Sequence, residues 1–271
     1  MLLPPQSTRR LVRRTHATCI QELARVYTLV ISAWLREERY DQVVAASGVA
    51  GAGPVPFAPA QQKRARERML ALRLKLNDNR IAVMQASYEL SLRGDYPKGP
   101  HMLLVTTQFV LLQALSQLGQ ALVRLDSKWR TQLVHRTAFL NQPLIADVSS
   151  SMALISLALR EGAPLPKATP GPLIDRLLYH DRRLRLMSEP GDGPVKHPLE
   201  DGGNVEIEGA QVGDFKLTRA VIEDERFGVY ASALQALASI LLAVDELERT
   251  TKQLVGQVDF PGYEELLKHT Q

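Results

Sequence analysis

Apolar residues recur at steps of three and four along most of this chain, the spacing of helices that bury one face. The first such segment runs from Ser7, a residue type that caps helices, to about Glu38. His16 falls on this apolar stripe, so we expect a buried core or interface histidine rather than a metal ligand. The buried stripe of this helix should comprise Val12, His16, Ile20, Leu23, Tyr27, Ile31 and Trp34.

A second helix is predicted from about residue 60 to 92, with basic residues in its first turns. Glycine and proline at Gly94 and Pro97 stop it. Its apolar stripe should comprise Leu70, Leu74, Ile81, Met84 and Tyr88.

Two further segments carry no charged residue, 102–123 and 227–244, and each is long enough to raise the question of a membrane span. Glutamines in the first segment would be costly in hydrocarbon, and both segments repeat like the seam of a helical bundle. We therefore predict bundle packing. The seams are Leu104, Leu111, Leu115, Leu118, Leu122, Leu125 and Trp129, and then Phe227, Tyr230, Leu234, Leu237, Leu241 and Val244.

Helices from about 143 to 160 and from about 171 to 187 lie between these segments, bounded by prolines. Glycine and proline are concentrated at about 41–60 and 188–216, which we predict to be long mobile loops. The pattern predicts an all-α fold: one domain over 1–271, built as an elongated bundle of five or six helices with two long Gly/Pro-rich loops. The 45% hydrophobic and 6% aromatic content favours helices around a substantial core.

The net charge of +4 is too small for a dedicated nucleic-acid binder, so we expect no nucleic-acid partner. Its distribution is more informative, because four arginines follow an apolar, proline-bearing start. A chain leaving a membrane on the cytosolic side has this pattern, and anionic lipid headgroups would be the contact. The alternative is a solvated first part of a helix. The residues are Arg9, Arg10, Arg13 and Arg14.

Motifs for catalysis and cofactors are missing from the sequence. The single cysteine, Cys19, rules out a disulfide within the chain and a zinc site of several cysteines. The six histidines show no helical metal-site spacing, and there is no glycine-rich phosphate loop or dinucleotide fingerprint. Serines 149–151 lack the glycines of a nucleophile elbow. We predict no metal, no cofactor and no enzymatic activity.

The segment around Trp129 combines one of two tryptophans with arginines and a following Pro143. Asp126 and Arg130 stand four residues apart and could pair along one helix face. One interpretation is a helix corner pinned by a buried aromatic. The other is a groove for an anionic group or a partner segment, bordered by Trp129, Arg130 and Arg136 as binding residues.

Several stretches together resemble a known family: Trp129-Arg130-x5-Arg136-Thr137-x-Phe139-Leu140-x2-Pro143, Gly162-x-Pro164-Leu165-Pro166, Pro170-x-Pro172-Leu173-x-Asp175-Arg176-Leu177, Asp245-Glu246-Leu247 and Leu254-Val255-Gly256. The basic helix from Arg9 to Tyr27, the turn Glu89-x3-Arg93-Gly94-x-Tyr96-Pro97-Lys98 and Asp147-Val148 add to the match. The chain resembles the C-terminal cytosolic domain of unknown function in fungal aromatic-acid-exporter-like ER transporter proteins, which include brefeldin A sensitivity proteins.

The resemblance implies that this chain follows the last transmembrane helix of a larger membrane protein, with its arginines at the cytosolic surface of the ER or plasma membrane. We expect a non-catalytic domain, soluble in isolation, that acts in assembly, gating or partner docking. Its partners would be the transmembrane region of the same protein, and a homo-oligomer is a further expectation. The alternatives are a free-standing helical scaffold that binds anionic membranes or acidic partners, and an anion-binding or enzymatic pocket near Trp129 and Arg136.

Overall fold

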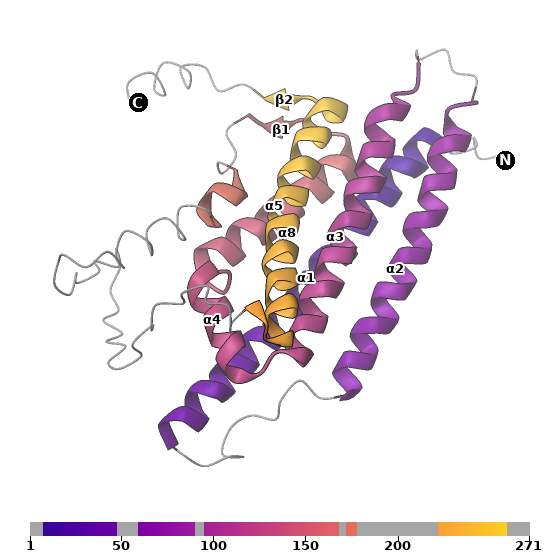
Figure 1. Cartoon of the computed structure of the whole chain (residues 1–271). Helices are drawn as coiled ribbons and strands as arrows, with labels where there is room; N and C mark the ends of the chain where they lie inside the picture. Colours follow the sequence, from indigo (N-terminus) through magenta and orange to yellow (C-terminus); the bar gives the residue numbers. More distant parts are fainter. Residues whose placement is uncertain (1–7, 48–58, 90–94, 168–171, 178–221, 259–271) are drawn as a thin grey trace, which may run out of the picture.

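A computed structural model describes residues 8–47, 59–89, 95–167, 172–177 and 222–258. Figure 1 shows long helices lying side by side, and this confirms the predicted all-α fold. The helices with bounds inside the described residues are α1 (Thr8–Ser47), α2 (Pro59–Ala86), α3 (Lys98–Arg124), α4 (Ser127–Thr137), α5 (Gln142–Glu161) and α8 (Glu225–Val255). Two strands of two residues each, β1 (Leu165–Pro166) and β2 (Gln257–Val258), pair in parallel.

The helices share one hydrophobic core, to which all six contribute side chains. Helix α1 contacts α2, α3 and α5, and α8 contacts α3 and α5. Helix α2 packs on α1 and α3 and forms the right-hand edge of the bundle in Figure 1. One long face of α2 therefore lies outside the bundle.

The apolar seams predicted for α1 and α3 are confirmed, because every predicted residue of both is buried. Trp34 is 1% exposed, and its indole N–H donates to the carbonyl of Leu118 at 3.2 Å, which ties the two seams together. In α8, Tyr230, Leu237 and Val244 are buried as predicted. Each of these helices has neighbouring helices on more than one side. The longest apolar stripe read from the sequence is therefore also the face that the helix buries in the core.

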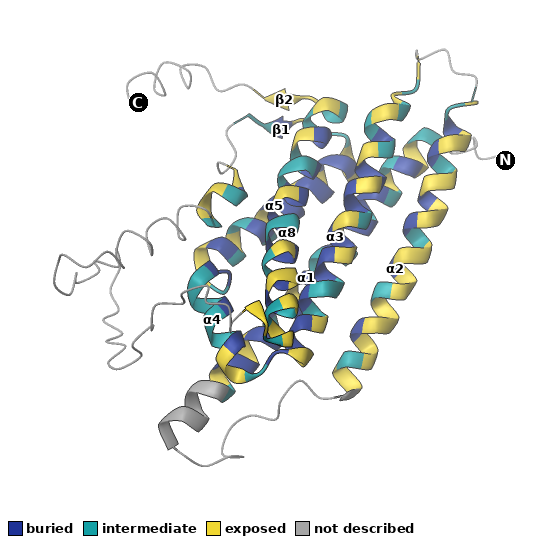
Figure 2. Ribbon diagram, viewed as in Figure 1, coloured by how far each residue is buried: buried dark blue, intermediate teal, exposed yellow. Residues whose placement is uncertain are grey.

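The prediction for α2 was wrong. Its predicted stripe is exposed, while a different set faces α1 and α3. Figure 2 shows exposed residues along the outer side of α2. The helix carries apolar residues on two opposite faces, and periodicity alone does not say which face meets the bundle. The buried set is Ala65, Leu72, Leu76, Asn79, Val83 and Ala86, and the exposed set is Leu70, Leu74, Ile81, Met84 and Tyr88.

Helix boundaries also differ from the prediction in places. Helix α1 continues to Ser47, so residues 41–47 are helical rather than part of a loop, and α2 ends at Ala86 rather than near 92. Residues 173–177 are helical, as predicted for the 171–187 helix. The rest of that helix and the predicted loop at 188–216 lie outside the described residues.

The α3 seam was predicted to run through Trp129 on one helix, but the chain breaks after Leu125. Leu125 and Asp126 adopt extended backbone conformations, and α4 starts at Ser127. Trp129 is nevertheless buried, on a separate helix of 11 residues. The Trp129 segment is thus a corner between two helices, as one interpretation of the sequence proposed.

Candidate functional site

Asp126 and Trp129 build the corner between α3 and α4. One carboxylate oxygen of Asp126 accepts a hydrogen bond from the backbone N–H of Trp129 at 3.1 Å, which satisfies one of the free donors at the start of α4. The indole packs against Tyr230 and Phe227 of α8, with ring centroids 5.3 and 6.5 Å apart. The aromatic side chain that marked this segment in the sequence therefore docks α4 on α8.

Arg130 does not pair with Asp126, contrary to the prediction from their spacing. One guanidinium nitrogen donates to the carbonyl of Leu125 at 3.0 Å, and the other lies 3.7 Å from a carboxylate oxygen of Glu37 on α1. Asp126 instead forms an ion pair with Arg226. Asp126 is the N-cap residue and precedes the first turn of α4, so the two side chains do not share a helix face as a pair four residues apart within one helix would.

Arg136, the third candidate binding residue, is half-buried in the last turn of α4. The structure thus brings Trp129 and Arg130 into the packed interface between α1, α4 and α8. None of the three candidates lines the three cavities described among α1, α2, α3 and α8.

The four N-terminal arginines divide into two pairs on α1. Arg10 and Arg14 are exposed. Arg9 lies over the ring of Tyr96, with its guanidinium carbon 5.5 Å from the ring centroid, and Arg13 lies against Gly162. Only Arg10 and Arg14 present their charges fully to an external surface.

A buried polar cluster around His16 was not predicted from the sequence. Nδ1 of His16 lies 3.1 Å from the amide nitrogen of Asn79 on α2 and 3.3 Å from that of Gln108 on α3. All three residues are at most 1% exposed. His16 was placed on the buried stripe of its helix, but its partners come from two other helices, and no local signal connects them.

A column of rings continues this cluster toward the start of α1. His16 stacks on His101 with centroids 5.3 Å apart, and His101 stacks on Tyr96 at 4.9 Å. Burial and the neighbouring His101 lower the pKa of His16 to about 3, and burial together with the Arg13 charge lowers the pKa of His101 to about 4. Both rings are therefore neutral near pH 7, and they lie in the core as uncharged polar groups.

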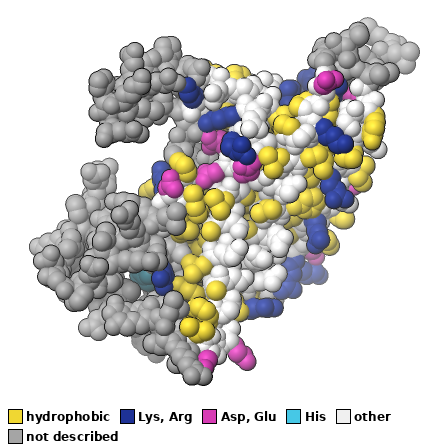
Figure 3. Space-filling view, turned by 45° about the horizontal axis from the view of Figure 1, so that its top comes forward, with side chains coloured by type: hydrophobic (Ala, Val, Ile, Leu, Met, Phe, Trp, Pro, Cys, Tyr) yellow, Lys and Arg dark blue, Asp and Glu magenta, His cyan; other side chains and the backbone are white. Residues whose placement is uncertain are grey.

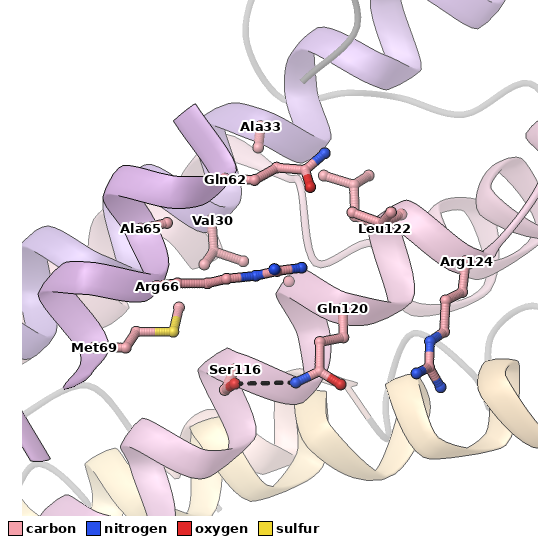
Figure 4. A pocket seen from close by; sticks show the side chains of 12 residues that line it. Val30, Ala33, Gln62, Ala65, Arg66, Met69, Ser116, Gln120, Leu122 and Arg124 are labelled. Atoms are coloured by element: carbon pink, nitrogen blue, oxygen red, sulfur yellow. Dashed lines mark hydrogen bonds between the residues drawn. The ribbon is translucent and has the colours of Figure 1, made fainter. Parts of the chain in front are cut away.

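A cavity of about 170 Å³ lies where α2 meets α1 and α3. Its walls are mostly apolar, while Arg66 reaches across it from α2 and Arg124 stands on the α3 side (Figure 4). The amide of Gln120 donates to the hydroxyl of Ser116 at 3.4 Å beside it. The lining residues are Val30, Ala33, Gln62, Ala65, Arg66, Met69, Ser116, Gly119, Gln120, Leu122, Val123 and Arg124.

Arg66 and Arg124 have no ion-pair partner within the part of the chain that the structure describes. Guanidinium groups bind carboxylates and phosphates through paired N–H donors, and apolar walls bind hydrocarbon. The cavity is therefore suited to a small molecule that has an apolar body and one acidic group.

The remaining sequence motifs meet one another in pairs. A carboxylate oxygen of Asp245 on α8 accepts from the backbone N–H of Leu173 at 3.1 Å, and Asp147 on α5 forms an ion pair with Arg176. The N–H of Leu165 in β1 donates to the carbonyl of Gly256 at 3.1 Å. These motifs connect segments that are far apart in the sequence, and they do not converge on one cavity. Across the described ranges, no group of three or more His, Cys, Asp or Glu residues could hold a metal ion.

The sequence profile of the Brefeldin A-sensitivity protein 4-like domain matches residues 7–259, nearly the whole chain. The chain belongs to this family. The chain is also 31% identical, over 112 residues, to an uncharacterized protein of Schizosaccharomyces pombe. That match covers 41% of the chain and only 8% of the yeast protein. No solved structure matches the domain.

The family match confirms the part of the resemblance that concerns brefeldin A sensitivity proteins, whereas the transporter and exporter context stays a prediction. Three helices of the domain, α3, α5 and α8, are long and apolar enough to cross a membrane by length and composition. In the bundle, between 44% and 50% of each apolar window is buried. The exposed side of α3 includes Gln113 and Gln120, whose amides would be costly in hydrocarbon.

Proposed function

We propose that this domain is a non-catalytic, cytosolic helical domain of a larger fungal membrane protein of the transporter type, acting in assembly, gating or partner docking. The observation that carries the proposal is the family match over residues 7–259. The pairing of the sequence motifs supports it, because motif residues that form joints between helices serve architecture rather than a reaction.

The yeast relative supports attachment to a larger polypeptide, since the matched segment is 8% of its length. The charge pattern at the start of α1 supports a position beside a membrane. Arg10 and Arg14 are exposed there, and arginines are enriched where a chain leaves a membrane on the cytosolic side. We infer that the start of α1 faces the cytosolic surface of the ER or plasma membrane, with the transmembrane region as first partner.

The test compares the full-length gene product with the 271-residue chain, both tagged at the C-terminus and expressed in a fungal host. We expect the full-length product to stay in the membrane pellet after alkaline carbonate extraction, with the tag open to protease added outside sealed microsomes. The chain alone should stay in the supernatant. Release of the full-length product by carbonate, or a tag protected inside the microsomes, would overturn the proposal.

The cavity beside α2 favours a second candidate function, binding of a small apolar acid. Benzoate and hexanoate are suitable probes because each combines an apolar body with one carboxylate. A bound ligand should raise the melting temperature with concentration, by mass action. Arg66→Gln should abolish the rise, whereas Arg64→Gln, which removes an exposed arginine outside the cavity, should leave it. An equal rise in both variants, or none in the wild type, would exclude this function.

A further inference from the structure

The outer face of α2 and the turn that follows it carry a row of large, exposed apolar side chains, one of which, Leu70, also lines a cavity beside Phe109 and Leu112 of α3. These five residues, here called the outer stripe, lie opposite the face that packs on α1 and α3. Figure 3 shows basic side chains along the same edge of the molecule. The exposed fractions are 60% for Leu70, 60% for Leu74, 49% for Ile81, 39% for Met84 and 81% for Tyr88.

The spacing of the outer stripe is that of a coiled coil. Its members follow one another at steps of four, seven, three and four, and Asn77 divides the step of seven into three and four. Positions 70, 77 and 84 are thus the d positions of successive heptads, and positions 74, 81 and 88 are the a positions. Within α2, which ends at Ala86, the seam runs for about 21 Å from Leu70 to Met84 at about 1.5 Å per residue, and Tyr88 lies in the turn that follows.

The charges beside the outer stripe are divided between its two flanks. Arg73 and Arg80 occupy the g positions on one flank, and Asp78 and Gln85 occupy the e positions on the other. All four side chains are exposed. In a parallel two-stranded coiled coil, each g residue faces the e residue of the next heptad on the other helix, and in an antiparallel pair g faces g.

We propose that α2 pairs with α2 of a second copy of this chain, as a parallel two-stranded coiled coil along the outer stripe. Arg73 then meets the partner's Asp78, and Arg80 meets the partner's Gln85, each twice by symmetry. An antiparallel pair would instead set arginine against arginine. Asn77 faces its counterpart, and a single amide in an apolar seam fixes the register of two helices.

An anionic bilayer is the competing occupant of the outer stripe, and the charges argue against it. Asp78 is exposed on one flank and Glu67 is exposed one heptad before Leu74, and a negative surface would repel both. Asn77 in the middle of the stripe would lose its hydrogen bonds with water in the acyl region. In the dimer, residues of the two flanks face one another and the Asn77 amide has a counterpart on the other copy. An anionic bilayer would pair only with the arginines.

The dimer leaves the bundle intact, because α2 binds α1 and α3 through its other face. A two-fold axis parallel to α2 places corresponding ends of both copies on the same side, as two chains in one membrane require. The inference rests on the proposed role in assembly, but pairing of α2 does not depend on membrane attachment.

The first experiment is sedimentation equilibrium of the 271-residue chain over a range of concentrations. We expect a reversible dimer, and Leu74→Glu should make it monomeric with unchanged circular dichroism because Leu74 is exposed. The matched control is Leu157→Glu on α5, a leucine 54% exposed and remote from the outer stripe, which should stay dimeric. A monomer at all concentrations, or a dimer unaffected by Leu74→Glu, would overturn the proposal.

A charge exchange tests the flanks. Arg73→Asp and Asp78→Arg should each weaken self-association by roughly tenfold or more, since every ion pair becomes a repulsive pair. Mixing the two variants should restore a dimer containing one copy of each, because the new charges are complementary. Failure of the mixture to associate would contradict the pairing of Arg73 with Asp78.

Cysteine crosslinking tests the direction. A Met84→Cys variant should crosslink to itself in a parallel pair, and Val123→Cys, exposed on α3, is the control that should not. The natural Cys19 is buried, which raises its pKa to about 11, so it should not compete.

A monomer that floats with anionic vesicles through Leu74 would replace this proposal by membrane binding. These outcomes are independent of the carbonate-extraction test of the full-length protein, so failure of the dimer and failure of the proposed membrane attachment can be told apart.

Discussion

The guanidinium group of Arg13 lies directly against Gly162, so closely that a Cβ at position 162 would come within 2.5 Å of a guanidinium nitrogen. Gly162 ends α5 in a left-handed conformation, with φ of 73°. The contact joins the basic start of α1 to the proline-containing turn before β1. It explains why an arginine that resembles a membrane-surface residue in the sequence is half-buried in the structure.

Gly162→Ala should destabilise the domain by about 1–2 kcal/mol, because an L side chain is strained in the left-handed region. Displacement of Arg13 would add to this. The matched control is Gly228→Ala on α8, where a Cβ meets nothing within 4 Å and the helix should gain about 0.5–1 kcal/mol. Urea unfolding measures both, and equal effects at the two glycines would contradict the assignment.

Stability should fall as the pH falls below about 6.5, because His16 and His101 are held neutral in the folded state. Burial is the main cause that lowers the pKa of His16 to about 3 and of His101 to about 4. Between these values and the pKa of the unfolded chain, the unfolded state binds more protons, so stability increases with pH. Each histidine contributes at most about 1.4 kcal/mol per pH unit.

Melting temperatures of wild type and His16→Gln between pH 5 and pH 7.5 measure this dependence. The variant should be less stable at pH 7.5, since a glutamine cannot reproduce the ring stack, but should lose less stability on acidification. Equal acid sensitivity in the two proteins would show that the buried histidine does not titrate in this range.

Asp126→Ala should cost about 1–2 kcal/mol of stability, because it removes the N-cap of α4 and the ion pair with Arg226. Asp126→Asn keeps an oxygen that can accept from the N–H of Trp129, so it should cost less. Urea unfolding followed by tryptophan fluorescence compares the two variants. Equal losses would assign the effect to the charge rather than to the cap.

Membrane binding by the isolated chain should depend on Arg10 and Arg14, if the N-terminal helix binds anionic surfaces. Their double alanine variant should lose flotation with anionic vesicles and keep its melting temperature, because both side chains are exposed. Alanine at Arg9 and Arg13 should lower the melting temperature instead, since these side chains pack on Tyr96 and Gly162. Binding that resists added salt would exclude a surface contact through these charges.

Much of the fold followed from periodicity. The seams of α1 and α3 needed only the spacing of their leucines, and the corner at Trp129 was marked by residue types that stop and pin helices. The cavity beside α2 was not predicted, because its residues come from three helices and form no motif. The predicted ion pair between Asp126 and Arg130 is not formed, because Asp126 caps α4 and pairs with Arg226 while Arg130 lies beside Glu37 of α1.

The sequence by itself determined the fold class, most helices, and the lack of recognisable motifs for metal, nucleotide or nucleophile chemistry. Tertiary structure alone decided which apolar face of α2 is buried, that Arg130 meets Glu37, and that His16 lies between Asn79 and Gln108. The physical reason is that periodicity is a property of one helix, whereas burial depends on the neighbouring surface. That distinction left Leu70, Leu74 and Ile81 outside the core, where a second copy of the chain can cover them.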